Sequence, residues 1–143
     1  MLTAEENVRL PLTIAGTKPD KKFFEDLLQK VGLSDRRSHR PSELSGGQQQ
    51  RVAIARALVS QPTVVFADEP TGNLDSATSG EILDLMRASV DELGQTTVMV
   101  THDPRAASIA DRILFLADGV IVKDMAGATA SEVIAEMDEL SLP

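Results

Sequence analysis

The sequence predicts an α/β protein whose first part is helical and whose second part forms βαβ units of a parallel sheet. Two observations carry this prediction. Apolar residues recur at the spacing of helix faces over residues 1–60, whereas short β-branched runs alternate with helical segments over residues 61–124. Strands that alternate with helices are typical of right-handed βαβ crossovers. An acidic helix is predicted over residues 125–143.

The helical part is predicted to begin with two short helices. Thr3 followed by Glu6 is a capping-box pattern, so a helix is expected to start there, and Pro11 is expected to kink or end it. Pro19 suits the first position of the second helix, and Gly32 supplies its C-terminal stop. The apolar face of this second helix consists of Phe23, Leu27, Leu28 and Val31.

A basic connector and a third helix complete the first part. Residues 36–41, rich in arginine and containing His39, lack apolar periodicity, so we expect a solvated loop. Ser45 and Gln48 form a second capping-box pattern, and Gln61-Pro62 is expected to end the helix that follows. The apolar face of this helix consists of Val52, Ala55, Leu58 and Val59.

In the second part, predicted strands alternate with predicted helices. We expect strands over residues 63–68, 96–101, 112–117 and 120–122, and helices over 76–93, from Asp103-Pro104 and from Ser131. Gly94 is expected to stop the long helix, because glycine readily adopts the left-handed C-terminal conformation. Asp118-Gly119, which separates the last two apolar runs, predicts a tight hairpin turn.

Composition and charge narrow the function classes. The 143 residues carry a net charge of −8, distributed as +3 over residues 1–60 and −11 over residues 61–143, so no nucleic-acid partner is expected. The absence of cysteine excludes disulfides, thiolate zinc sites and a cysteine nucleophile. The longest apolar run, Ile113–Ala117, falls far short of the ~18 residues that span a bilayer.

Two adjacent carboxylates, Asp68 and Glu69, follow the first predicted strand. They would lie at the sheet edge where open α/β proteins bind their ligands. Neighbouring carboxylates repel each other unless a cation or a proton relay uses them, which predicts chemistry at this point. A simple acidic turn at the end of a strand is the structural alternative.

The stretch Leu44–Leu58 begins Leu-Ser-Gly-Gly-Gln and resembles the signature motif of ATP-binding-cassette (ABC) ATPases. Its two glycines let backbone N–H groups approach an anion, Ser45 adds a hydroxyl, and the helix N-terminus adds partial positive charge. A lone Ser-Gly-Gly sequence would serve equally well as a helix cap. The whole stretch, followed by further family-like motifs in order, makes the resemblance specific.

The resemblance implies an incomplete P-loop NTPase (ABC ATPase) fold that binds and hydrolyses ATP with Mg²⁺. It implies that Asp68 holds Mg²⁺ as the Walker B carboxylate, that Glu69 is the general base, and that His102 contacts the γ-phosphate. The residues implied to contact ATP bound to the partner subunit are Ser45, Gly46, Gly47, Gln48 and, in the D-loop, Asp75. Helix capping by Asp75 is compatible with its implied role.

Three segments look most like the ATPases of lipoprotein-release and macrolide-export transporters: Glu6–Leu12, Ala67–Asp75 and Thr101–Arg112. This resemblance implies an integral-membrane permease as partner and a homodimer of ATPase subunits in the full-length protein. It also implies a cytoplasmic location, peripheral on the inner face of the cell membrane through the permease.

The phosphate-cradling P-loop, Gly-x-x-x-x-Gly-Lys-Ser/Thr, is missing. None of the nine glycines is followed by lysine. We therefore expect Met1 to be an internal methionine of a longer protein and the isolated chain to have little or no turnover. The strand over residues 64–68, without its usual neighbours, is expected to have bare edges and apolar faces.

Two alternative functions make different demands on the sequence. A non-catalytic interaction module derived from an ABC ATPase would explain why motifs persist without the P-loop. A chromosome-maintenance or repair ATPase of the same superfamily would require coiled-coil heptads and a basic surface, and the sequence has no heptad run and a charge of −8.

Overall fold

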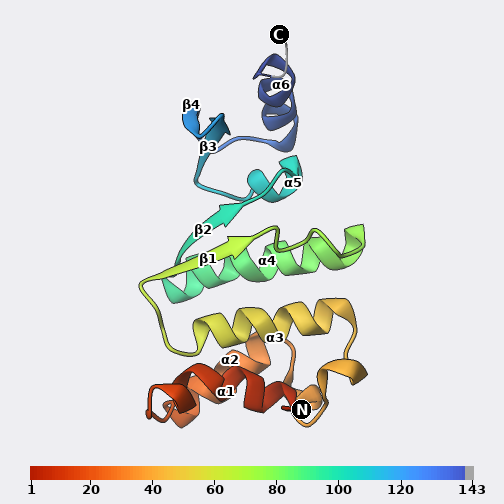
Figure 1. The fold of residues 1–143 in the computed structure, drawn as a ribbon, viewed down its shortest axis with the longest axis vertical. Coiled ribbons are helices and arrows are strands. Elements are labelled where there is room, and N and C mark those ends of the chain that lie inside the picture. Colours follow the sequence, from red (N-terminus) through yellow and green to blue (C-terminus); the bar gives the residue numbers. More distant parts are fainter. Residues whose placement is uncertain (141–143) are drawn as a thin grey trace. The chain divides into compact units, whose positions relative to one another are not determined.

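The computed structural model describes residues 1–140 and divides into two compact units, residues 1–98 and residues 99 onward (Figure 1). Each unit is described by itself. Among the described residues, no helix has the length and apolar character needed to cross a membrane.

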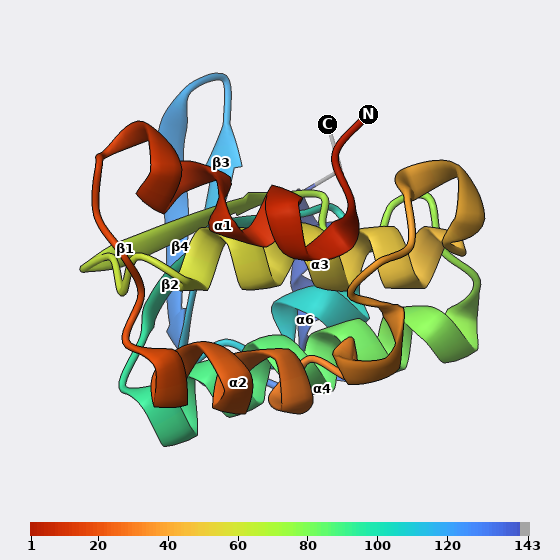
Figure 2. The same ribbon diagram turned by 90° about the horizontal axis from the view of Figure 1, so that it is seen from below.

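Three helices build the core of the first unit: α1 (Ala4–Ile14), α2 (Lys21–Lys30) and α3 (Gly46–Leu58). α1 packs against α3, and α4 (Ser76–Leu93) packs against α3 as well (Figure 2). Their apolar faces bury one cluster: Ala4, Val8, Leu12, Phe24, Leu27, Leu28, Val31, Leu33, Leu44, Val52, Ala55, Leu58 and Val59.

The bounds of α1 and α2 agree with the predicted cap at Thr3 but differ from what the two prolines predicted. Thr3 and Glu6 form the predicted capping box, in which the Thr3 N–H donates to Glu6 Oε2 at 2.8 Å. Helix α1 does not end at Pro11 but continues to Ile14. Pro19 lies outside α2, contrary to the prediction, because Asp20 is the N-cap and its carboxylate accepts from the Phe23 N–H at 2.7 Å.

The basic connector is not a simple solvated loop, because one of its arginines joins two helices. Arg37 donates to Glu5 Oε2 on α1 at 2.7 Å and to both carboxylate oxygens of Glu25 on α2. The connector backbone also docks on α1, since the carbonyl of His39 accepts from the Ala4 N–H at 2.8 Å. Two 3₁₀ turns flank this contact, η1 (Ser34–Arg36) and η2 (Pro41–Glu43).

The strand–helix–strand unit is formed as predicted. β1 (Val64–Asp68) leads into α4, and β2 (Thr96–Val100) pairs with β1 in a small two-stranded parallel sheet (Figure 1). Gly94, with φ of 65°, ends α4 in the left-handed conformation that favours glycine. Phe66 on β1 is 79% exposed, as expected for a strand with an uncovered apolar face.

The second unit holds a short helix, a hairpin and a final helix: α5 (Pro104–Ala107), β3 (Arg112–Ala117), β4 (Val120–Ala126) and α6 (Ala130–Leu140). Asp118 and Gly119 have φ values of 49° and 77°, which form the predicted tight turn. β3 pairs antiparallel with β4, which forms the hairpin that this turn predicts.

Candidate functional site

The Ser-Gly-Gly-Gln segment at the start of α3 is a doubly capped helix N-terminus. Ser45 is the N-cap, and its hydroxyl accepts from the Gln48 N–H at 3.3 Å. The Gln48 side chain accepts in return from the Ser45 N–H at 2.9 Å. This reciprocal pair holds the first turn of α3 in one conformation at the positive end of the helix dipole. The arrangement suits an anion.

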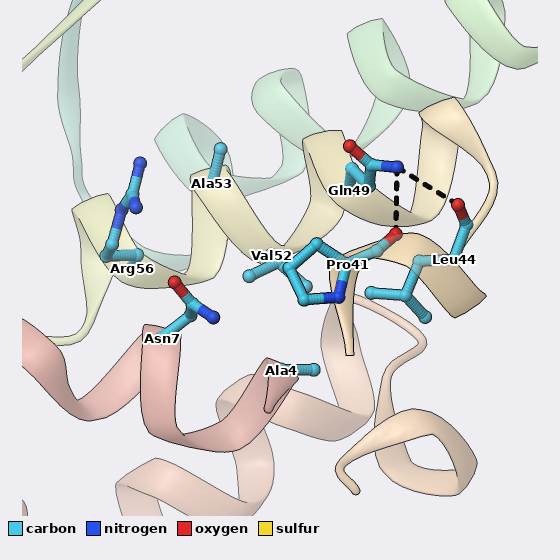
Figure 3. Close-up of a pocket in the computed structure, with 8 residues that line it drawn as sticks. All are labelled: Ala4, Asn7, Pro41, Leu44, Gln49, Val52, Ala53 and Arg56. Atoms are coloured by element: carbon cyan, nitrogen blue, oxygen red, sulfur yellow. Dashed lines mark hydrogen bonds between the residues drawn. The ribbon is translucent and has the colours of Figure 1, made fainter. Parts of the chain in front are cut away.

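Gln49 anchors the chain that leads into this segment. Its amide nitrogen donates to the carbonyl of Pro41 at 3.0 Å and to the carbonyl of Leu44 at 3.1 Å (Figure 3). These bonds tie the turn before Ser45 to the second turn of α3. Beside them lies a small open groove of about 150 Å³ between α1, η2 and α3, lined by Ala4, Asn7, Pro41, Leu44, Gln49, Val52, Ala53 and Arg56.

The fold brings Ser45–Gln48, which we call the signature segment, against the loop that joins β1 to α4. This loop contains Asp75 and is called the Asp75 loop. A Cβ built on Gly46 would lie 3.4 Å from Leu74 Cδ2, and one built on Gly47 would overlap with Thr78 Cγ2. The backbone of Gly47 is buried at this contact. Two segments about thirty residues apart in the sequence thus meet at the first turns of two neighbouring helices.

Asp75 is the N-cap of α4, as its structural interpretation predicted. One carboxylate oxygen accepts from the N–H groups of Ala77 and Thr78, at 3.1 and 3.0 Å, and the other accepts from the Thr78 hydroxyl at 2.6 Å. The hydrogen bonds from Thr78 lower the pKa of Asp75 below its ordinary value. These hydrogen bonds favour the charged form of the carboxylate.

Asp68 and Glu69 occupy the end of β1 and the turn that follows. Asp68 is exposed, whereas Glu69 is half-buried and has φ of 43°, in the left-handed region. Such a conformation costs a non-glycine residue roughly 1–3 kcal/mol and is most often retained at functional sites. The Glu69 carbonyl accepts from the Gly72 N–H at 3.1 Å, which closes the turn toward the Asp75 loop.

The donor chemistry at this turn fits Mg²⁺. Carboxylate oxygens are its preferred protein ligands, and proteins commonly hold the ion through one or two of them, with phosphate and water supplying the rest. Asp68 offers an exposed carboxylate of this kind. Within residues 1–140, no group of three or more His, Cys, Asp or Glu side chains forms a complete metal cage. An ion here would need oxygen ligands from phosphate or water.

His102 belongs to the second unit. It lies in the loop between β2 and α5, and its side chain is exposed. The loop is tightened on both sides of it. The Asp103 N–H donates to Thr101 Oγ1 at 3.0 Å, and Asp103 in turn caps α5 by accepting from the Arg105 N–H at 2.9 Å. The loop geometry thus presents the imidazole at the end of a strand, as predicted for this residue.

Two residues that position the site, Arg51 and Thr78, were not predicted from the sequence. Arg51 donates to the carbonyl of Val31 at the end of α2 at 3.0 Å and pairs with Glu81 on α4 at 2.8 Å. Thr78 holds the Asp75 carboxylate and covers Gly47. A threonine three residues after a capping aspartate was a visible signal for Thr78, whereas the partners of Arg51 come from two distant helices.

Comparison with known proteins identifies the family. Residues 1–72 match the family described as "ABC transporter". The chain belongs to this family. This ABC transporter chain is 54% identical over 121 residues to the lipoprotein-releasing system ATP-binding protein LolD of Syntrophotalea carbinolica, covering 83% of the chain and 53% of LolD. It is 46% identical over 140 residues to the macrolide export ATP-binding/permease protein MacB of Marinobacter nauticus, covering 96% of the chain and 22% of MacB.

A solved structure agrees with the family assignment. An ATP-binding cassette, determined as a dimer in a post-hydrolysis state bound to ADP and Pi, matches with a TM-score of 0.72 and 40% identity. The match covers 88% of this chain and 57% of the cassette. The predicted fold and the predicted group of relatives are thereby confirmed. The ABC transporter chain spans about half the length of LolD and of the cassette.

Proposed function

We propose that this chain is the signature-containing and catalytic-base-containing portion of an ABC transporter ATPase subunit that couples ATP hydrolysis to substrate export or lipoprotein release. The observation that carries the proposal is the contact of Gly46 and Gly47 with Leu74 and Thr78. This contact joins an anion-binding helix N-terminus to the Asp75 loop, which is linked by one turn to the carboxylates at the end of β1.

Each site residue has a proposed role. Asp68 would hold Mg²⁺, which supplies positive charge to the phosphates of bound ATP. Glu69 would accept the proton of the water that attacks the γ-phosphate, and His102 would donate a hydrogen bond to that phosphate. The residues proposed to contact ATP bound to the partner subunit are Ser45, Gly46, Gly47, Gln48 and Asp75.

We further propose three functional parts: a signature-containing helical subdomain over residues 1–60, a catalytic part with Walker B, D-loop and switch histidine over residues 61–124, and an acidic C-terminal part over residues 125–143. The helix expected for this last part is α6, which spans Ala130–Leu140, because residues 125 and 126 belong to β4, and residues 141–143 lie outside the described residues. Hydrolysis requires a P-loop, which this sequence does not contain. The 143 residues by themselves should therefore turn over little ATP, because the phosphates lack the lysine and backbone amides that hold them.

The proposed partners are an integral-membrane permease and a second ATPase subunit. The name of the relative MacB, an ATP-binding/permease protein, supports a permease, and the dimeric cassette supports pairing of two subunits. The subunit would lie on the cytoplasmic face of the membrane through the permease. No nucleic-acid partner is proposed, since the net charge is −8.

The experiment is ATP hydrolysis by the chain joined to a P-loop-containing N-terminal portion of a close ABC ATPase. The substitution Glu69→Gln should lower the hydrolysis rate by about 10²–10⁴-fold, because the general base is lost, while Mg-ATP binding measured by calorimetry is retained. Glu92→Gln, which changes an exposed carboxylate on α4, is the matched control and should leave the rate unchanged.

The same experiment tests the non-catalytic alternative. The missing Gly-Lys pair is the observation that favours an interaction module. If the joined protein neither binds nor hydrolyses Mg-ATP, the catalytic proposal is wrong and the module is supported. Rapid hydrolysis by the 143 residues alone would contradict the expected need for a P-loop.

A further inference from the structure

Gly47 is glycine in this fold because another side chain of the same chain occupies the space of its Cβ. A Cβ built at this position would overlap with Thr78 Cγ2, well inside the distance at which carbon atoms can approach. Gly80, in the second turn of α4, has nothing within 4 Å of the same position. The steric demand on Gly47 therefore comes from its neighbour and not from helix geometry.

The Thr78 methyl group cannot easily turn away. The Thr78 hydroxyl donates to one oxygen of Asp75 at 2.6 Å, while the Thr78 N–H donates to the other at 3.0 Å. A rotation about χ1 that withdraws the methyl group would break the hydroxyl bond, and threonine in a helix has few alternative rotamers. The position of the methyl group over Gly47 is thus set by Asp75.

The two helices cannot separate freely to relieve an overlap. Arg51, on α3, pairs with Glu81 on α4 at 2.8 Å and donates to the Val31 carbonyl at 3.0 Å. The Arg51 side chain is only 22% exposed, so this link lies partly inside the structure. It holds α3 beside α4 at a point one turn beyond Gly47.

From these contacts we propose that Thr78 is a positioning residue that links the Asp75 loop to the signature segment within one chain. Asp75 orients Thr78, and the Thr78 methyl group sets how closely the turn at Gly47 approaches α4. A displacement of the Asp75 loop would then move the backbone of the signature segment with it. The importance of this link for ATP rests on the proposed function, but the link itself is a property of the fold.

The test is a mutant cycle on the 143-residue chain, read as the folding equilibrium constant from denaturant unfolding. Gly47→Ala should lower this constant by about tenfold or more, because overpacking is costly. The matched control Gly80→Ala should raise it by roughly two- to fivefold, because alanine favours the helix and meets nothing.

Two substitutions of Thr78 separate its methyl group from its hydroxyl. In a Thr78→Ser background, which keeps the hydroxyl and removes the methyl group, the loss caused by Gly47→Ala should shrink to less than about threefold. In a Thr78→Val background, in which methyl groups take the places of both the methyl and the hydroxyl group, the loss should persist without the bond to Asp75. An equal loss in the Thr78→Ser and wild-type backgrounds would overturn the proposal, as would failure of the Gly47→Ala/Thr78→Ser double variant to fold.

The role of Asp75 is tested by the same cycle. Asp75→Ala releases the Thr78 hydroxyl, so the loss caused by Gly47→Ala should be several-fold smaller in this background than in the wild type. Purely additive effects would refute transmission from Asp75. None of these measurements involves ATP, so a negative result would overturn the positioning role and leave the proposed function to its own test.

Discussion

The helical region, residues 1–60, buries more of its large apolar side chains than the hairpin unit, residues 99–140. The helical region encloses a cluster of buried side chains that includes Phe24, Leu28 and Val31, each at most 1% exposed. The hairpin unit buries few, among them Ile113 and Val133. Many of its large apolar side chains are exposed, among them Leu114, Leu116, Val120, Ile121, Val122, Ile134 and Leu140.

This difference indicates which part of the chain is self-sufficient. The helical region closes its own core and adds a network of ion pairs at its surface. The hairpin owes its form to its turn and its ladder, and its apolar strand faces resemble surfaces that need a cover. The part that carries the signature segment is therefore expected to be the more stable one when the chain is unfolded gradually.

The largest effect should come from a cavity in the helical region. Leu28→Ala removes a side chain that is 1% exposed in the last turn of α2 and should lower the free energy of unfolding by about 2–5 kcal/mol. The measurement is denaturant unfolding followed by circular dichroism. Leu116→Ala in the hairpin is the matched control and should change the same quantity by less than about 0.5 kcal/mol, since Leu116 is 68% exposed. Equal effects would contradict the comparison.

An effect of intermediate size on stability is expected when the carboxylates that pair with Arg37 become protonated at low pH. Hydrogen bonds from Arg37 lower the pKa values of Glu5 and Glu25 below their ordinary value of 4.5. Because the folded-state pKa values are the lower ones, these carboxylates contribute their full stabilisation above pH 4.5 and lose it as the pH falls through the folded values.

The substitution Arg37→Ala should therefore destabilise the chain at pH 7 and flatten the fall in stability below pH 4.5. Unfolding measured at a series of pH values would show this. The control is Arg112→Ala, which breaks the exposed pair with Asp124 in the hairpin and should have the smaller effect at pH 7. A pH profile unchanged by Arg37→Ala would rule out the network as its source.

The smallest effect on stability is expected at the exposed hairpin face. Leu116→Thr keeps strand propensity and removes exposed apolar surface, so the free energy of unfolding should stay within about 0.5 kcal/mol of the wild type. Self-association, measured by light scattering at increasing concentration, should decrease, because bare apolar strands promote aggregation. Unchanged association would show that the chains do not associate through this face.

Much of the local structure was predictable because its causes lie within a few residues. The capping boxes at Thr3 and Ser45, the bounds of α4 and the turn at Asp118-Gly119 all follow from adjacent side chains and backbone preferences. The antiparallel pairing of β3 with β4 follows from that turn as well. An alternation of strands and helices, by contrast, does not specify which strands become neighbours in a sheet.

The candidate site divides in the same way. The residues with implied chemistry, Asp68, Glu69 and His102, were recognisable because the motif order of an ABC ATPase is written in the sequence. The roles of Arg37, Arg51 and Thr78 were not, since each depends on atoms from segments that are distant along the chain. Their partners become known only when the helices are packed.

By itself, the sequence determined the family, the order of the elements and the residues that carry the chemistry, because these depend on local propensity and on motif identity. Only the tertiary structure decided that Gly47 is covered by Thr78 and that Asp75 governs this contact. The physical reason is that side-chain packing and hydrogen bonds across helices depend on distances in space. No pattern along the chain specifies those distances.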